Sequence, residues 1–163
     1  MFEVLVYVYE HYWRGDACPE PEHLERKLSA VGFEAEEIEE ALTWLSGLSL
    51  AAQGTQTSDK TNSEKPVDPR TQSSQSMRVY STAEQEHLGS QCLGFISFLE
   101  SSGVLPAHMR EIVLDRAMAA PGDPVSIDDL KIMVLMVYWS FGEEPDALIL
   151  DELCDDGSQR IAH

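Results

Sequence analysis

The segment Ile127–Phe141 is apolar on nearly every side of the helix that its pattern predicts. Its apolar residues are Leu130, Ile132, Met133, Val134, Leu135, Met136 and Val137. Ser126, with Asp129 three residues on, has the spacing of a capping box and favours a helix start at this point. A helix without a polar face must be covered by other elements. The sequence therefore predicts a helical bundle with this segment at its centre.

Two further helices are expected before this segment. Met77–Tyr80 predicts a short extended piece, and Ser81 with Glu84 is a capping box that opens a helix ending near Gly103. A second helix is expected after Pro106.

The end of the chain is expected to be less regular. Glu143–Leu153 predicts a short last helix, and residues 156–163 predict a flexible tail. Residues 77–155 are therefore expected to form a C-terminal helical bundle.

Residues 1–51 predict a separate unit of three helices. Apolar residues recur at helical spacing in a first helix ending near Gly15, a second following Pro21 and ending at Gly32, and a third opening at Ala35. A unit of this length is marginally stable alone, so we expect it to lean on the rest of the chain or on a partner.

Residues 52–76 separate the two units. This stretch is dominated by Gln, Thr, Ser, Asp and Lys and contains no aromatic residue. It cannot bury enough apolar surface to offset its conformational entropy, so we expect a disordered polar linker. The predicted fold class is all-α: two small helical segments joined by this linker, with at most one short extended piece near residues 77–80.

The charge of the chain limits the classes of molecule that it is expected to bind. The chain has 29 acidic residues against 11 Lys and Arg, a net charge of −18, and most of the acid lies in the two helical segments. Proteins that bind nucleic acids or anionic membranes usually carry the opposite sign, because Lys and Arg make the phosphate contacts. Direct nucleic-acid binding and membrane binding are therefore not expected.

The sequence also predicts a cytosolic setting. The three cysteines, Cys18, Cys92 and Cys154, are far apart and form no CxxC pair, as in a reduced protein with idle thiols. The first residues lack the basic region of a secretory signal, and Ile132–Trp139, the longest apolar stretch, is far short of a membrane span.

Two Glu-x-x-His pairs, Glu20 with His23 and Glu84 with His87, have the spacing of ligands in a di-iron helical bundle. Both glutamates stand where a helix begins, so capping acids beside solvated histidines are the simpler interpretation. Signature loops and motifs of common enzymes are absent from the sequence. We therefore expect no metal, no cofactor and no enzymatic activity, with a metal-dependent enzyme of unrecognised type as an open alternative.

A helix-turn-helix outline is a second alternative. Leu24 and Leu28, the turn at Gly32, and Ile38 with Ala41 have its spacing. The second helix opens with an acidic stretch, residues 34–40, which would repel phosphate where a DNA reader needs Arg, Lys, Asn or Gln. This acidic stretch is most simply a solvated face, although it suits a basic partner.

Five residues of the C-terminal segment are candidates for a charged interaction cluster. They are Arg78, Arg110, Glu111, Asp115 and Arg116. Glu111 and Asp115 are like-charged neighbours on one helix face, and such repulsion is normally relieved by an arginine. The alternative interpretation of the same residues is purely structural: Arg116 or Arg78 bridges the two carboxylates.

The chain resembles the bacterial Smg family. The resemblance rests on Met1–Tyr7, Leu28–Phe33, Ala41–Leu45 and Arg78–Ser81. It continues in Gly94-Phe95, Phe98–Glu100, Arg110-Glu111, Asp115–Met118 and Asp128–Lys131. It implies a cytosolic bacterial protein of unassigned activity without established catalytic residues, and the genes near family members imply a link to DNA- or translation-related housekeeping.

Charge, motifs and resemblance together predict a non-enzymatic accessory protein. Its acidic surface is expected to engage a protein partner that is basic or handles nucleic acids. The sequence leaves open the identity of the partner, the docking of the two segments and the oligomeric state.

Overall fold

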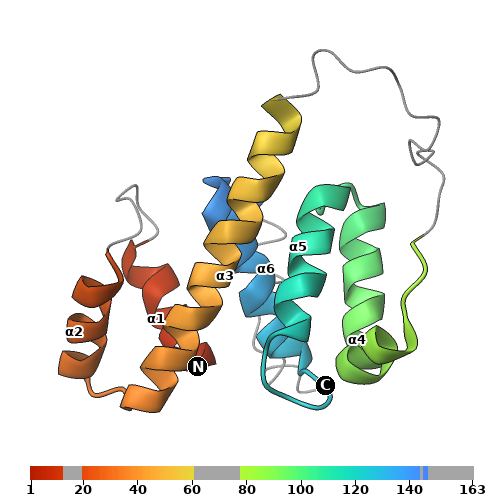
Figure 1. Ribbon diagram of the computed structural model, residues 1–163. Helices are drawn as coiled ribbons and strands as arrows, with labels where there is room; N and C mark the ends of the chain where they lie inside the picture. The colour runs from red at the N-terminus through yellow and green to blue at the C-terminus, as the bar shows by residue number, and fades with distance from the viewer. Residues whose placement is uncertain (13–19, 61–77, 144, 147–163) are drawn as a thin grey trace, which may run out of the picture.

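The computed structural model describes residues 1–12, 20–60, 78–143 and 145–146 (Figure 1). The described residues form six α-helices and no strand, which confirms the predicted all-α class. The helices are α1 (Phe2–Tyr12), α2 (Pro21–Val31), α3 (Ala35–Lys60), α4 (Thr82–Ser101), α5 (Ala107–Met118) and α6 (Ile127–Phe141).

Helix α6 lies at the centre of the described fold, as its composition predicts. It packs against α1, α3, α4 and α5. Its buried residues are Leu130, Met133, Val134, Leu135, Met136, Val137 and Tyr138. The six consecutive residues from Met133 to Tyr138 are buried, so this helix has contacts on every side.

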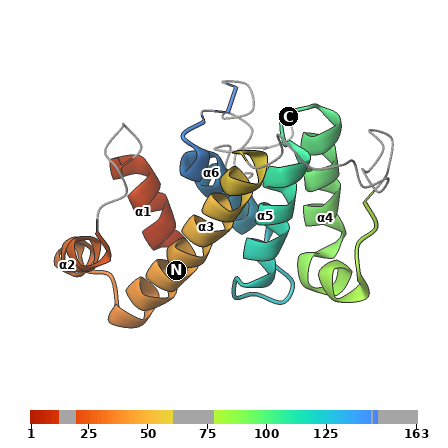
Figure 2. The same cartoon turned by 45° about the horizontal axis from the view of Figure 1, so that its top comes forward.

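The two predicted segments share one hydrophobic core. Helices α1 and α3 from the first segment pack directly on α6, and α3 also packs along α5. Helix α2 lies at one edge of the described fold against α3, and α4 lies at the opposite edge against α5 and α6 (Figures 1 and 2). The docking that the sequence left open is therefore present.

The helix ends follow the predicted signals. Ser81 and Glu84 form a reciprocal capping box at the start of α4, and the Ser126 hydroxyl accepts a hydrogen bond from the Asp129 amide at the start of α6. Gly32 ends α2 in the left-handed conformation, with φ of 113°.

Helix α4 contains a break that the sequence did not predict. Gly89 has φ of 69° and ψ of 169°. These values lie outside the helical region, but glycine adopts them without strain. The break leaves the carbonyl of His87 to accept a hydrogen bond of 2.8 Å from the amide of Val125, in the segment before α6. Gly89 therefore divides α4 into two parts, and the part after Gly89 is the longer one.

The boundary after the first segment differs from the prediction. Helix α3 continues past residue 51 and through Lys60, so the first part of the expected linker is helical. Ala52 is buried one turn after the buried Leu48, and this contact continues the inward face of the helix. Figure 1 shows the end of α3 extending beyond its neighbours.

Several predicted features lie outside the described residues. These are the rest of the expected linker, residues 61–76, and the tail at 156–163. The expected last helix, Glu143–Leu153, also falls mostly outside, and its described residues 143 and 145–146 are not helical. No helix within the described ranges is long and apolar enough to cross a membrane.

Candidate functional site

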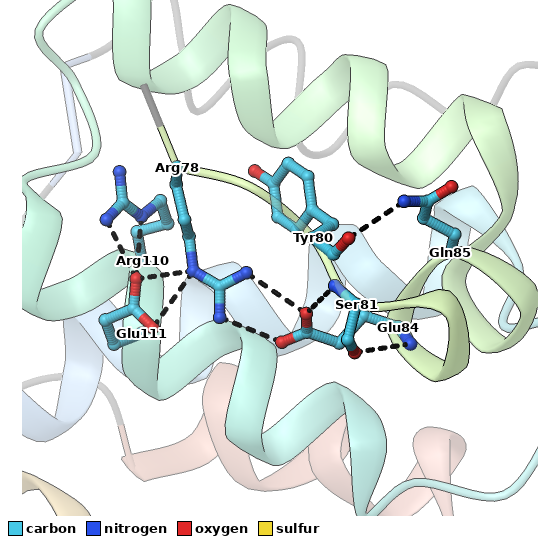
Figure 3. Close-up of polar contacts among 7 residues, drawn as sticks. All are labelled: Arg78, Tyr80, Ser81, Glu84, Gln85, Arg110 and Glu111. Atoms are coloured by element: carbon cyan, nitrogen blue, oxygen red, sulfur yellow. Dashed lines mark hydrogen bonds and ion pairs between the residues drawn. The ribbon is translucent and has the colours of Figure 1, made fainter. Parts of the chain in front are cut away.

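Arg78 joins the segment before α4 to two helices. Its guanidinium donates to both carboxylate oxygens of Glu84 on α4, at 2.8 and 3.2 Å, and its Nε donates to Glu111 on α5 at 2.8 Å (Figure 3). The same group lies 4.9 Å from the centre of the Tyr80 ring, a cation–π distance. One arginine therefore fixes the start of α4 against α5.

Arg110 is the buried member of the same network. Its side chain is 6 % exposed, and its guanidinium donates to Glu111 at 2.8 and 3.0 Å and to Glu100 near the end of α4. Glu111 thus accepts hydrogen bonds from Arg78 and Arg110 at once. We call Arg78, Glu84, Glu100, Arg110 and Glu111 the arginine clasp.

The clasp stabilises the charged form of its members. The hydrogen bond from Arg78, followed by the backbone amide of Ser81 at 2.7 Å, lowers the pKa of Glu84 to about 2. The carboxylates, Glu84 foremost, raise the pKa of Arg78 above its already high usual value. Burial, together with the nearby Glu100 carboxylate, raises the pKa of Tyr80.

The structure divides the predicted charged cluster in two. Arg78, Arg110 and Glu111 belong to the clasp, whereas Asp115 and Arg116 pair with each other at 2.6 Å further along α5. No arginine in the described residues bridges Glu111 and Asp115: Glu111 pairs with Arg78 and Arg110, whereas Asp115 pairs with Arg116.

Glu84 and Glu100 complete the clasp and were missing from the predicted cluster. The sequence identifies Glu84 as a cap, and the structure shows that one carboxylate both caps α4 and holds Arg78. Glu100 and Arg110 stand on either side of the turn between α4 and α5, where an antiparallel helix pair brings its ends together. Their opposite charges close to the two ends of this turn are the signal that points to their contact.

The clasp is a structural junction by its chemistry. Its arginines and carboxylates satisfy one another, and it contains no nucleophile and no unpaired base. A fully paired network fixes geometry and leaves little charge for a ligand.

A second site lies where α3 meets α5. An open groove of about 770 Å³ is lined by acidic residues of the first turns of α3, by Trp44, and by the end of α5. Its lining residues are Met1, Glu36, Glu39, Glu40, Thr43, Trp44, Arg116, Ala119, Ala120 and Pro121. We call this the acidic groove.

The carboxylates of the acidic groove are available to a ligand. Glu36, Glu39 and Glu40 are exposed, and within the described part of the chain no cation lies within ion-pair distance of them. The neighbouring Glu37 has a cation nearby, the terminal amine of Met1 at 3.8 Å. Arg116 lines the groove but is already held by Asp115.

A close helix contact forms the floor of this groove. The Trp44 indole donates a hydrogen bond of 3.0 Å to the carbonyl of Arg116, and the Arg116 guanidinium lies over Gly47. A Cβ at position 47 would stand 1.8 Å from Nη1 of Arg116, so any other residue there requires the guanidinium to move aside. A glycine inside a predicted helix is the sequence signal for such an approach.

The residues of the two Glu-x-x-His pairs lie apart from both sites or serve other contacts. Glu20 and His23 are exposed at the start of α2, and Glu84 belongs to the clasp. A ring nitrogen of His87 lies 3.1 Å from the carbonyl of Ala117. The described residues contain no group of three His, Cys, Asp or Glu side chains placed to hold a metal ion.

Comparison with known proteins gives the family. Residues 1–163 match the family described as "Protein of unknown function (DUF494)". The chain is 60 % identical to "Protein Smg homolog" of Leptothrix cholodnii and 58 % identical to that of Methylibium petroleiphilum, over the full length of each chain. It is 46 % identical to the homolog of Bordetella petrii, again over both full lengths.

No solved structure matches the chain. The family match spans every residue, and the relatives are aligned from end to end. The chain belongs to the Smg family, the DUF494 proteins, whose function is uncharacterised.

Proposed function

We propose that this Smg family protein is a non-enzymatic accessory protein of the bacterial cytoplasm that binds a basic protein partner through its acidic groove. The observation that carries the proposal is the set of three exposed carboxylates, Glu36, Glu39 and Glu40, beside a groove on the junction of α3 and α5. Each lacks a cation among the described residues, so a partner's Lys or Arg side chains would supply the missing charge.

The net charge of −18 supports the same proposal at longer range. A strongly negative protein attracts a positive surface and repels polyanions, and this steering raises the rate of association. The interaction should therefore weaken as salt rises, because ions screen exposed charges over about 10 Å at 0.1 M.

The test is affinity enrichment from a lysate of a bacterium that carries a Smg homolog. The bait proteins are the wild type, Glu36→Gln/Glu39→Gln/Glu40→Gln, and a control of equal charge change, Glu22→Gln/Glu25→Gln/Glu86→Gln. The control residues are exposed on α2 and α4, away from the groove. Enriched proteins are quantified by mass spectrometry at about 50 mM and 300 mM salt.

We expect a basic protein to be retained by the wild type and the control at low salt, to be lost from the groove variant, and to decline at high salt. Equal retention by the groove variant and the control would contradict the groove as the binding site. No protein enriched by the wild type at either salt would contradict the accessory role itself.

A helix-turn-helix regulator is the second candidate, and the packing of α2 against α3 supports it. Helices α2 and α3 pack together across a turn at Gly32, with Leu24, Leu28 and Ile38 buried between them. The first turn of α3 is acidic, however, which is unfavourable for phosphate. A mobility-shift titration at low salt tests it, and absence of any shift would remove this candidate.

A further inference from the structure

Arg116 places a positive charge in the wall of the acidic groove. This guanidinium would repel a basic partner, and it would neutralise the groove carboxylates if it reached them. It pairs with Asp115 instead, and in the described residues no ion pair joins it to a groove glutamate. The direction in which this one side chain extends therefore decides how much negative charge the groove offers.

The backbone of Arg116 lies between two turns of α3. Its carbonyl accepts the hydrogen bond of 3.0 Å from the Trp44 indole, and this contact sets its level along α3. Gly47 is three residues after Trp44, about 4.5 Å along the helix axis, and Glu40 is four residues before it, about 6 Å in the other direction. The spacing of four and three residues puts all three positions on one stripe of α3. A long side chain at this level can extend toward the glycine or toward the glutamate.

The guanidinium of Arg116 extends toward the glycine. A Cβ on Gly47 would stand 1.8 Å from Nη1 and 2.8 Å from Cζ, so the guanidinium occupies the space that a side chain would take. Its Nε and Nη2 both donate to the same Oδ2 of Asp115, at 3.0 and 2.6 Å. Two features thus hold the charge away from Glu40: a position without a side chain on α3 and a carboxylate on α5.

The backbone gives no reason for a glycine at position 47. Its φ is not positive, and glycine within a helix is less stable than alanine. The contact with the Arg116 guanidinium is the feature of the described fold that uses the missing side chain. By contrast, a Cβ on Gly54 in the same helix would meet open space.

We infer that Gly47 and Asp115 are positioning residues that keep the Arg116 guanidinium away from the groove glutamates. The inference rests on the proposed function and concerns the control of the same groove. If a side chain fills the space at Gly47, or if Asp115 loses its charge, the guanidinium turns to Glu40, whose carboxylate attracts it. The ion pair formed in this way removes one carboxylate from the reach of a basic partner, so binding weakens.

The test measures the binding of a labelled peptide of alternating Arg and Gly residues to the whole chain, by fluorescence anisotropy at about 50 mM salt. The variants are Gly47→Ala, Asp115→Asn, Arg116→Met and Gly47→Ala/Arg116→Met. Methionine is uncharged but keeps much of the length of arginine. Circular dichroism of each variant checks that the helices are intact.

Each single change has a matched control. Gly54→Ala is the same substitution in the same helix, at a position with open space. Glu86→Gln removes one negative charge, as Asp115→Asn does, from an exposed residue of α4 that does not line the groove. The groove variant Glu36→Gln/Glu39→Gln/Glu40→Gln shows how much of the binding belongs to the groove.

We expect Gly47→Ala and Asp115→Asn each to weaken binding by about two- to fivefold relative to their controls, the range of one exposed ion pair. Arg116→Met should strengthen binding, and Gly47→Ala should have no further effect beside it, because no charge remains to be displaced. Unchanged binding by Gly47→Ala or by Asp115→Asn contradicts the inference. A loss from Gly47→Ala that persists beside Arg116→Met also contradicts it, because it would show a role in packing alone.

The groove variant separates this inference from the proposed function. If it binds the peptide as well as the wild type does, the groove is not the binding site, and both proposals are wrong. If it binds more weakly but the Gly47 and Asp115 variants match their controls, only the positioning role is wrong.

Discussion

Glu84 shows how one side chain serves both local and tertiary structure. Its carboxylate accepts from the Ser81 amide, which caps α4, and from Arg78, which also reaches Glu111 on α5. Both contacts favour the ionised carboxylate, so together they lower the pKa of Glu84. Removing this one group should therefore affect the start of α4 and its attachment to α5.

We predict that Glu84→Gln lowers the free energy of unfolding at pH 7 by about 1–3 kcal/mol. The folded pKa of about 2 lies below the ordinary value of 4.5, so the stabilisation is complete above the ordinary value and is lost as the pH falls toward 2. Urea unfolding of wild type and variant from pH 7 to about 3 should show the gap between them narrowing.

Glu86→Gln is the control for this series, since Glu86 is exposed on the same helix and should change stability by less than about 0.5 kcal/mol. A gap between wild type and Glu84→Gln that stays constant with pH would contradict the role given to the ionised carboxylate.

At the scale of the residue, the sequence points to only part of the arginine clasp. Arg78, Arg110 and Glu111 were among the five polar residues of the resemblance segments that were predicted to form a charged cluster, and the structure places these three together. Arg116 instead lines the groove and pairs with Asp115, because one further turn of α5 carries these two residues past the clasp. Such a distinction depends on where α3 crosses α5, which no local pattern contains.

At the scale of the element, the contact between α3 and α5 includes a glycine that an arginine side chain covers. Gly47 lies inside α3 and leaves room for the Arg116 guanidinium, while Trp44 one turn earlier donates to the Arg116 carbonyl. The helix gives up some intrinsic stability at Gly47 so that the two helices can approach.

We predict that Gly47→Ala stabilises the fold by less than Gly54→Ala does, because the gain of about 0.5–1 kcal/mol from alanine is offset by displacing the Arg116 guanidinium. Its Cβ would lie 1.8 Å from Nη1 and 2.8 Å from Cζ of Arg116, so the guanidinium must leave its place. Gly54→Ala in the same helix is the control, because its Cβ would meet open space and should stabilise by about 0.5–1 kcal/mol. Urea unfolding that shows equal stabilisation by both alanines would contradict the packing described.

The sequence predicts the presence of the helices better than it predicts where each helix ends. The apolar periodicity and caps locate α1, α2, α4, α5 and α6, but the end of α3 was placed too early. Its Gln, Thr and Ser residues resemble a linker by composition. Once Leu48 and Ala52 are packed, however, each further residue adds a helical hydrogen bond at low entropic cost.

At the scale of the whole molecule, the account depends on the docking of the two predicted segments. The acidic groove has walls from both, since Glu36, Glu39 and Glu40 come from the first segment and Arg116 to Pro121 from the second. The core is likewise continuous from α1 through α6 to α4. If the segments moved independently, neither the groove nor its charge would be held in one place.

The most direct test follows unfolding in both segments at once. One variant keeps Trp44 as its single tryptophan and the other keeps Trp139, with phenylalanine at the remaining tryptophan positions. Trp44 is buried on α3 against α5, and Trp139 lies on α6. Each variant is unfolded in urea and followed by tryptophan fluorescence and by helical circular dichroism. A shared core predicts that the two signals coincide within each variant, in one cooperative transition. A fluorescence transition that separates from the loss of helix in either variant would contradict the single fold on which the acidic groove depends.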